Sequence, residues 1–229
     1  MRGLVIIPAY NEEGAIINTV ENIKKNAPSF DYVVINDCST DNTPQILDNY
    51  NINHVDLPIN LGIGGAVQTG YIYAEKYNYD CAVQMDGDGQ HDAAFLEEMI
   101  KHLEQNEGDM IIGSRFLEKE GFQSSALRRM GIRFYTRLIH FLTGGTVTDP
   151  TSGMRLANKQ VISMFAKHYP KDYPEPETAV TVLKNKLRIK EIPVKMLART
   201  TGESSISTKQ SVYYMIKVTI ACCIARLSA

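Results

Sequence analysis

The fold is decided by residues 81–91, which read Cys-Ala-Val-Gln-Met-Asp-Gly-Asp-Gly-Gln-His. The largely apolar residues 81–85 predict a buried strand, and the carboxylates Asp86 and Asp88 follow directly at its carboxyl end. The intervening glycines let the backbone turn sharply and approach a ligand closely. Carboxylate oxygens at this spacing, with the amide of Gln90 two residues further on, suit Mg²⁺ or Mn²⁺ that is also bound by a diphosphate.

Residues 86–91 allow two other interpretations. A solvated acidic turn is the simpler explanation of an isolated Asp-x-Asp. An EF-hand loop would place Glu97 at its twelfth position, but its sixth position is His91 rather than glycine, and a strand rather than a helix precedes it. The position after a buried strand of a parallel sheet favours the metal–diphosphate interpretation.

Strand-like and helix-like segments alternate on both sides of this stretch. Because such alternation is typical of a parallel sheet covered by helices on both faces, we expect an α/β fold whose ligands bind at the carboxyl ends of the strands. The predicted strands are residues 4–7, 32–35, 53–57, 81–85 and 110–112, and the predicted helices are residues 12–26, 43–50, 65–77 and 93–105.

The alternation weakens after residue 115. Here the sequence predicts a basic helix at 125–142, a turn-rich segment at 144–155, a helix at 158–167, an acidic loop at 172–177 that opens a helix to 186, and a strand at 189–197. With no repeat or linker, we expect one domain over residues 1–205. Residues 206–229 would form a C-terminal apolar or amphipathic helix.

Composition excludes several classes of protein. The net charge of −2 gives no overall positive field, so nucleic acid is not an expected partner. The four cysteines lack the paired spacing of a metal site, and with no secretory leader they indicate reduced thiols in a cytosolic protein. No uncharged apolar run reaches about 18 residues, which excludes a confident transmembrane helix.

Two further polar segments follow predicted strands. The glycine-rich residues 60–66 do not match a dinucleotide fingerprint, because Val67 occupies the third glycine position; a tight turn before the next helix and a phosphate-contacting loop stay equally open. Residues 36–43 contain the polar side chains of a helix cap. Capping does not explain Asp37, which ends the strand and could accept a hydrogen bond from a nucleobase N–H.

Six segments together resemble the family 2 glycosyltransferases, most closely the branch of dolichyl-phosphate mannose synthase and its bacterial polyprenyl-phosphate and polysaccharide relatives. They occur in the family's order over about residues 1–206: Ile-Pro-Ala-Tyr-Asn-Glu at 7–12, Asn-Asp-Cys-Ser-Thr-Asp at 36–41, residues 85–91, Gly-Ser-Arg at 113–115, Asp-Pro-Thr-Ser-Gly-Met-Arg at 149–155, and 191–194 leading to 199–205. The resemblance implies a GT-A type nucleotide-diphospho-sugar transferase fold and an inverting single displacement.

The resemblance also implies roles for individual residues. Pro8, Tyr10, Glu12, Asp37 and Asp86 would bind the nucleotide, and Asp86, Asp88 and Gln90 would surround the metal. Arg115 and Arg199 would face the diphosphate and the acceptor, since a guanidinium binds phosphate oxygens in a bidentate manner. Two departures remove basic groups that the family often carries: Ile63 in the glycine-rich loop, and Ser205 at the end of the last segment.

Glu177 bears on the nature of the acceptor. It lies in the first turn of a predicted helix, where a carboxylate is favoured by the helix dipole, and related transferases carry a catalytic carboxylate at this position. A sugar hydroxyl must lose a proton during attack and needs such a base. A polyprenyl phosphate, with a second pKa of about 6, does not. The predicted catalytic set is Asp88, Arg115, Glu177 and Arg199.

The basic helix indicates a membrane surface. Its helical wheel gathers Leu127, Met130, Phe134, Leu138, Phe141 and Leu142 into one stripe, beside which Arg129, Arg133 and Arg137 recur at every fourth residue. Such a helix can lie in the headgroup region, with arginines on lipid phosphates. A packed surface helix whose arginines pair with acidic neighbours is the alternative. Residues 212–227 predict a second apolar helix for the membrane or an oligomer contact.

The expected function is transfer of a sugar from a UDP- or GDP-sugar to a polyprenyl phosphate, by a peripheral protein on the cytoplasmic face of the cell membrane. Transfer to a glycan hydroxyl during cell-surface polysaccharide assembly is the alternative acceptor chemistry. A nucleotide-sugar-binding subunit without activity is the alternative class. A sugar nucleotidyltransferase is disfavoured, because residues 8–13 are acidic where that class needs a basic glycine-rich loop.

Overall fold

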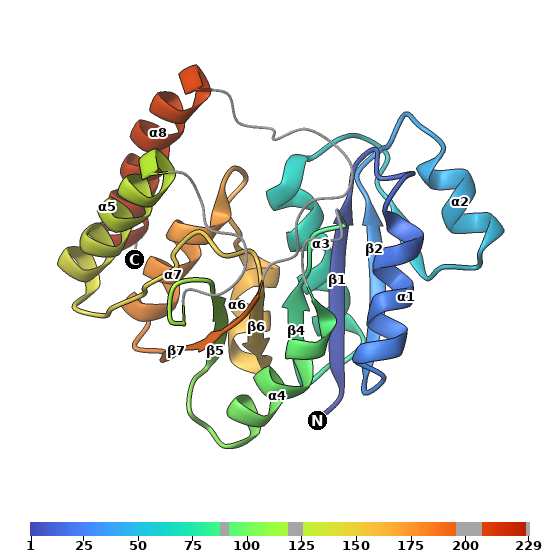
Figure 1. Cartoon of the computed structure of the whole chain (residues 1–229), viewed down its shortest axis with the longest axis horizontal. Helices are drawn as coiled ribbons and strands as arrows, with labels where there is room; N and C mark the ends of the chain where they lie inside the picture. Colours follow the sequence, from blue (N-terminus) through green and yellow to red (C-terminus); the bar gives the residue numbers. More distant parts are fainter. Residues whose placement is uncertain (88–91, 119–125, 196–207, 228–229) are drawn as a thin grey trace.

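The computed structural model describes residues 1–87, 92–118, 126–195 and 208–227. A seven-stranded sheet runs through the molecule and carries helices on both faces (Figure 1). The α/β fold expected from the alternating segments is confirmed.

The first half of the chain follows the predicted alternation closely. Helix α1 begins four residues later than predicted, and α3 begins three residues earlier and includes the glycines of the glycine-rich run. The elements are β1 (Gly3–Ala9), α1 (Ile16–Asn26), β2 (Phe30–Asn36), α2 (Thr43–Asn49), β3 (His54–Asp56), α3 (Gly62–Lys76), β4 (Cys81–Gln84), the short 3₁₀ helix η1 (Ala93–Phe95) and α4 (Leu96–Glu104).

The second half contains a strand that the sequence did not predict. This strand, β6 (Arg155–Asn158), has only four residues, and none of them is β-branched or aromatic, so its sequence carries no strand signal. The other elements are β5 (Met110–Ser114), α5 (Ala126–Thr143), α6 (Lys159–Lys167), α7 (Pro174–Lys184), β7 (Ile189–Pro193) and α8 (Thr208–Leu227).

The strand order is β3-β2-β1-β4-β6-β5-β7. All neighbours run parallel except β6, which is antiparallel to both β4 and β5. The carboxyl ends of β1, β2 and β4 therefore lie side by side at one edge of the sheet, and those of β5 and β7 lie at the same edge beyond β6.

The alternating side chains of the central strands form two cores. From β1, Leu4 and Ile6 join the core shared with α3 and α6, whereas Val5 and Ile7 join the core shared with α1 and α4. Each of these fully buried aliphatic side chains contributes about 1.5–3 kcal/mol of transfer free energy. A change of register by one residue would exchange the two faces, so the pattern fixes how β1 sits between its neighbours.

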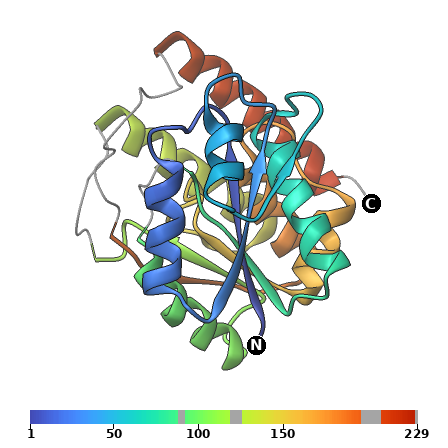
Figure 2. The ribbon, with the colours of Figure 1, turned by 90° about the vertical axis from the view of Figure 1, so that its right-hand side faces the viewer.

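Helices α5 and α8 lie side by side at the end of the molecule opposite α1 and α2 (Figures 1 and 2). The Tyr135 hydroxyl of α5 donates to the Met215 carbonyl of α8 at 3.1 Å, and Arg226 Nε of α8 donates to the Leu142 carbonyl at 2.7 Å. Val218 and Cys222 are buried in the core that α3 and α6 share. The predicted boundary at residue 205 lies outside the described residues. Among the described helices, none is both long and apolar enough to cross a membrane.

Candidate active site

The adjacent ends of β1, β2 and β4 bring three predicted binding segments together. The Asp37 amide donates to the Ala9 carbonyl at 2.9 Å, and the Met85 amide donates to the Ile6 carbonyl at 3.0 Å, so the strands stay paired up to the loops. A Cβ at Gly87 would lie 3.2 Å from the Pro8 carbonyl oxygen. The structure therefore brings Asp86 next to the segment of Pro8 and Glu12, as predicted, with Tyr10 exposed beside them.

The loops that follow β1 and β2 are joined by hydrogen bonds between them. The Asn11 amide donates to Ser39 Oγ at 3.0 Å, and the Thr40 amide donates to Asn11 Oδ1 at 2.8 Å. The Glu12 amide donates to Thr43 Oγ1 at 2.9 Å. These bonds use the polar side chains that the sequence explained as helix caps, and they hold the two loops in one arrangement at the sheet edge.

Asp37 has a structural role that the sequence did not indicate. Its two carboxylate oxygens accept from the amides of Leu61 and Gly62, at 2.7 and 2.9 Å. These amides are the unsatisfied donors at the start of α3, where a negative charge is favoured by the helix dipole. The residue is only 3% exposed. Its predicted contact with a nucleobase stays a prediction, whereas its attachment of α3 to the end of β2 is observed.

The glycine-rich run serves the start of α3. Gly62 has φ of +75°, a conformation that favours glycine. The Gly64 amide donates to the Lys171 carbonyl at 3.1 Å, and a Cβ at Gly64 would lie 2.0 Å from the Pro170 carbonyl oxygen. Of the two interpretations left open, the tight turn into a helix is observed, together with close backbone packing.

Asp86 is half-buried just beyond β4, and its Oδ1 accepts from Gln84 Nε2 at 3.2 Å. A carboxylate is a ligand that Mg²⁺ and Mn²⁺ prefer, so Asp86 fits the expected metal. The other two predicted ligands, Asp88 and Gln90, lie outside the described residues. Within the described residues, no three His, Cys, Asp or Glu side chains gather into a metal site.

The structure separates the two glutamates at the start of α7. Burial raises the pKa of Glu177, and the charged group that acts on it is His168. Burial also raises the pKa of Glu175, but here the charged groups in reach are Arg155, Asp86 and Arg115. The charge of Asp86 thus acts on Glu175, and the catalytic role predicted for Glu177 stays a prediction. Both residues share one helix start, so sequence position alone could not distinguish them.

Arg155 fixes the backbone around Glu175. It pairs in register with Gln84 across the β4–β6 ladder and is buried. Its Nη1 donates to the Glu175 carbonyl at 2.6 Å and to Thr178 Oγ1 at 2.9 Å, and its Nη2 donates to the Pro150 carbonyl at 2.9 Å. The family-like segment 149–155 contained this residue, but only the unpredicted strand β6 explains how it reaches α7.

Arg115, at the end of β5, forms a buried ion pair with Asp149. Nε donates to Asp149 Oδ2 at 2.6 Å and Nη2 donates to Oδ1 at 2.7 Å, which is the bidentate geometry of strong Arg–carboxylate pairs. Glu191 of β7 holds the same loop by accepting from the Asp149 amide at 2.8 Å. A hollow of about 200 Å³ borders Arg115. Its contact with a diphosphate stays a prediction, and Arg199 lies outside the described residues.

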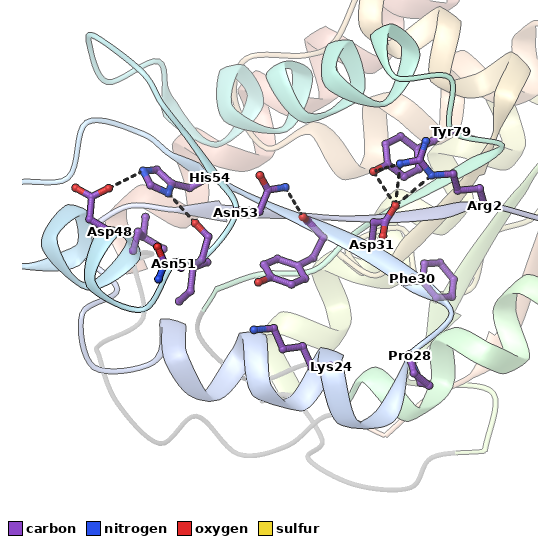
Figure 3. Close-up of a pocket in the computed structure, with 13 residues that line it drawn as sticks. Arg2, Lys24, Pro28, Phe30, Asp31, Asp48, Asn51, Asn53, His54 and Tyr79 are labelled. Atoms are coloured by element: carbon purple, nitrogen blue, oxygen red, sulfur yellow. Dashed lines mark hydrogen bonds and ion pairs between the residues drawn. The ribbon is translucent and has the colours of Figure 1, made fainter.

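A larger hollow of about 780 Å³ lies elsewhere, along the amino-terminal half of β2 (Figure 3). Its lining contains none of the predicted donor-binding residues. The polar groups there bind one another: Arg2 Nη2 pairs with Asp31 at 3.0 Å, and Asn53 Nδ2 donates to the Tyr32 carbonyl at 2.8 Å. Despite its size, this hollow is not a candidate for the predicted chemistry.

Helix α5 differs in part from its predicted wheel. Its inward face consists of Ile132, Tyr135 and Ile139, whereas Met130, Phe134 and Phe141 of the predicted stripe are exposed, Phe141 by 85%. Arg129, Arg133 and Arg137 are exposed as well. Arg133 and Arg137 form no ion pair with any described residue, so the pairing required by the packed-helix alternative is not observed for them. Nothing is described of the side chain of Leu127.

Helix α8, which packs beside α5, also has an exposed apolar face. Its exposed apolar side chains, Ile216, Ile220, Ile224 and Leu227, recur at nearly every fourth residue and so lie on one face. We call the exposed side chains Met130, Phe134 and Phe141 of α5, with these four of α8, the α5–α8 surface.

Comparisons with known proteins bear on the family and the fold of this chain. The model of the family "Glycosyl transferase family 2" matches residues 4–165. The UDP-N-acetylglucosamine–dolichyl-phosphate N-acetylglucosaminyltransferase of Methanococcus voltae is 32% identical, with 84% of each chain covered. The undecaprenyl-phosphate mannosyltransferase of Micrococcus luteus is 27% identical, with 90% of this chain and 88% of the relative covered.

Solved structures share the fold at lower identity. Glucosyl-3-phosphoglycerate synthase from Mycobacterium tuberculosis in complex with UDP has a TM-score of 0.73 at 17% identity, covering 100% of this chain and 81% of that one. S. aureus TarS with UDP-GlcNAc has a TM-score of 0.65 at 18% identity, covering 96% of this chain and 65% of that one. These likenesses confirm the expected GT-A type fold. The family match over residues 4–165 and the 32% identity to the M. voltae enzyme show that the chain belongs to glycosyl transferase family 2.

Proposed function

We propose that the protein transfers a sugar, with inversion, from a nucleotide-diphospho-sugar to a polyprenyl phosphate. The observation that carries this proposal is the likeness to the M. voltae and M. luteus enzymes over more than four fifths of each chain, since the names of both specify a polyprenyl phosphate acceptor. A third relative, the polyprenol monophosphomannose synthase of Mycolicibacterium smegmatis, is 26% identical and specifies the same class of acceptor.

On the donor side, the nucleotide lies at the ends of β1, β2 and β4. Pro8, Tyr10, Glu12 and Asp37 border the nucleoside, and UDP- and GDP-sugars are both candidates. Asp86, Asp88 and Gln90 would hold Mg²⁺ or Mn²⁺, and a related fold has been crystallised with Mn²⁺ and UDP. When bound, the ion stabilises negative charge on the departing diphosphate. Arg115 and Arg199 would add positive charge at the diphosphate and the acceptor.

On the acceptor side, a phosphate oxygen forms the new bond to the anomeric carbon while the bond from that carbon to the nucleotide diphosphate breaks. With a second pKa of about 6, a phosphate monoester is largely dianionic at neutral pH and needs no base. The charged neighbour of Glu177 is His168, not Asp86, which agrees with a reaction that does not use Glu177 as a base.

Transfer to a glycan hydroxyl is kept as a second candidate because of Glu175, a half-buried residue whose carboxyl is within electrostatic reach of Asp86. A hydroxyl acceptor would need this group as its base, with a loss of about 10²–10⁴-fold in kcat on substitution. Glu175→Gln with retained turnover supports the phosphate acceptor. Glu177→Gln, from the same helix turn, applies the same test to the carboxylate predicted from the sequence.

The proposed place of action is the membrane surface, because a polyprenyl chain is confined there. The α5–α8 surface exposes large apolar side chains next to Arg129, Arg133 and Arg137, a combination that suits the boundary between acyl chains and anionic headgroups. An oligomer contact through α8 is the competing use of this surface.

The deciding experiment is a screen of UDP- and GDP-sugars against short polyprenyl phosphates with Mn²⁺ or Mg²⁺, with the glycolipid product measured directly. One donor should give product, and the same prenol without phosphate should give none. Nucleotide binding without transfer to any lipid or glycan would instead identify a non-catalytic binding subunit.

A further inference from the structure

A chain of buried polar groups lies beneath the Asp86 carboxylate. Gln84, the last residue of β4, is buried, and its Nε2 donates to Asp86 Oδ1 at 3.2 Å. Its Oε1 accepts from the Tyr169 hydroxyl at 3.3 Å. Tyr169 is itself buried and comes from the connection between α6 and α7, so two distant parts of the chain meet behind one carboxylate.

The hydrogen bonds that link Tyr169, Gln84 and Asp86 run in one direction, from the Tyr169 hydroxyl to the Asp86 carboxylate. Burial raises the pKa of the Tyr169 hydroxyl well above its ordinary value of 10, so it stays protonated and can donate. A glutamine amide offers an acceptor at one end and donors at the other. The Tyr169 hydroxyl therefore holds the carbonyl end of Gln84, which turns the NH₂ end towards Asp86. Without it, a flipped amide would place its oxygen against a carboxylate.

Among the described residues, Arg155 does not hold the Gln84 amide, although it is the cross-strand partner of Gln84. Its hydrogen bonds go to main-chain carbonyls and to Thr178. The ring of Tyr169 packs against Phe165 at 5.2 Å and Tyr71 at 5.6 Å between centroids, and this packing does not require the hydroxyl. The hydroxyl is thus a separate feature of the residue.

We propose that Tyr169 is a positioning residue that acts through Gln84 to hold the Asp86 carboxylate in the orientation needed by the metal–nucleotide complex. This inference rests on the proposed function only in taking Asp86 as a metal-binding residue. Groups that orient a metal-binding side chain commonly change metal affinity by about 10–100-fold when removed. The same order of effect is expected here.

The test uses the full chain and measures Mn²⁺ binding by calorimetry at saturating UDP or GDP, with no acceptor present. Tyr169→Phe keeps the ring and removes the hydroxyl, and we expect it to raise the Kd for Mn²⁺ by about tenfold. Tyr71→Phe is the matched control: this neighbouring tyrosine is equally buried, and its hydroxyl has no hydrogen bond with the described residues. The Kd of Tyr71→Phe for Mn²⁺ should equal that of the wild type.

A second variant makes the test specific to the proposed route. Gln84→Met keeps the length of the side chain but breaks both hydrogen bonds, so it should weaken Mn²⁺ binding at least as much. Adding Tyr169→Phe to Gln84→Met should then have no further effect, because the hydroxyl acts through the amide. If circular dichroism shows that Tyr169→Phe does not fold, Gln84→Met alone tests whether the Gln84 amide affects Mn²⁺ binding by Asp86.

Wild-type Mn²⁺ affinity in Tyr169→Phe, or additive effects in the double variant, would overturn the inference. So would a wild-type protein that binds no Mn²⁺ with either nucleotide. Failure of the proposed function has a different signature, namely normal Mn²⁺–nucleotide binding without sugar transfer to polyprenyl phosphate. In that case, the calorimetric measurements of Mn²⁺ binding still decide the role of Tyr169.

Discussion

At the scale of single residues, the candidate active site contains a buried ion pair, whereas ion pairs on the protein surface are in contact with water. Asp149 is fully buried and holds Arg115 in two parallel hydrogen bonds, whereas the ion pair between Asp172 and Lys217, at 2.6 Å, is exposed. A buried ion deprived of its partner cannot be stabilised by water, so the two pairs should respond very differently to the loss of one charge.

Asp149→Asn should lower the free energy of unfolding by about 3–5 kcal/mol, because it removes the buried carboxylate that accepts two hydrogen bonds from the Arg115 guanidinium. Asp172→Asn, the matched control, should cost at most about 1 kcal/mol. Urea unfolding followed by circular dichroism measures both values. Equal losses would mean that the Arg115–Asp149 pair contributes no more than a surface pair.

The pKa of Glu175 predicts a pH-dependent stability. Burial raises this pKa above the ordinary value of 4.5, with Arg155 partly opposing the shift. The folded chain therefore binds the proton more tightly than the unfolded chain, and the associated stability is complete below pH 4.5 and lost as the pH rises through the raised pKa.

Because glutamine does not ionise, the melting temperature of Glu175→Gln should rise relative to that of the wild type as the pH increases through that window. The gain should then level off. Thermal unfolding between about pH 4 and 8 measures the difference, with the exposed Glu21→Gln on α1 as a control. A difference that shrinks with rising pH would show that Arg155 stabilises the ionised carboxylate more than burial opposes it.

At the scale of the element, one glycine of α3 is closely packed against backbone and one glycine of α5 is not. Gly64 lies against the main chain of residues 170–171, whereas a Cβ on Gly131 of α5 would meet no described residue within 4 Å. The same substitution should therefore have opposite signs in the two helices.

Gly64→Ala should destabilise the protein by about 1–3 kcal/mol or more, because its methyl group would overlap the Pro170 carbonyl and force the start of α3 away. Gly131→Ala should instead stabilise by about 0.5–1 kcal/mol through helix propensity. Urea unfolding distinguishes the signs. A stable Gly64→Ala protein would show that residues 170–171 move without cost.

At the scale of the whole molecule, the α5–α8 surface exists only because helices from distant parts of the sequence pack together. Helices α5 and α8 lie at the opposite end of the molecule from α2 (Figure 1), and the apolar side chains of this surface and the neighbouring arginines are exposed. Binding to a membrane should therefore combine apolar burial with attraction to anionic lipid.

The double substitution Arg133→Gln and Arg137→Gln should weaken binding to anionic vesicles by about 30-fold, from about 1 kcal/mol per arginine. Salt should weaken the wild type more than this variant. Phe134→Ser should reduce binding to neutral and anionic vesicles alike, and Tyr50→Ser, beyond α2, is the control. Vesicle co-sedimentation measures all four proteins. Binding unchanged in every variant, with a concentration-dependent dimer, would instead identify an oligomer contact.

Much of the donor side could be predicted from sequence, because its determinants are local. An apolar strand followed by carboxylates indicates where a ligand edge lies, and strict alternation of strands and helices predicts a parallel sheet. Asp86, Pro8 and Glu12 come together for that reason. Strand β6 could not be predicted, because four residues without β-branched side chains form a strand only when β4 and β5 offer their edges.

The amino-acid sequence alone predicted six of the seven strands, the order of the motifs and the family. Only the tertiary structure decided which polar groups meet behind that edge: Tyr169 with Gln84, Arg155 with the main chain of Glu175, and Asp37 with the start of α3. The physical reason is the separation in sequence over which each kind of signal acts. Periodicity reports on neighbours within an element, whereas buried hydrogen bonds form between residues far apart in sequence, wherever packing leaves a donor facing an acceptor.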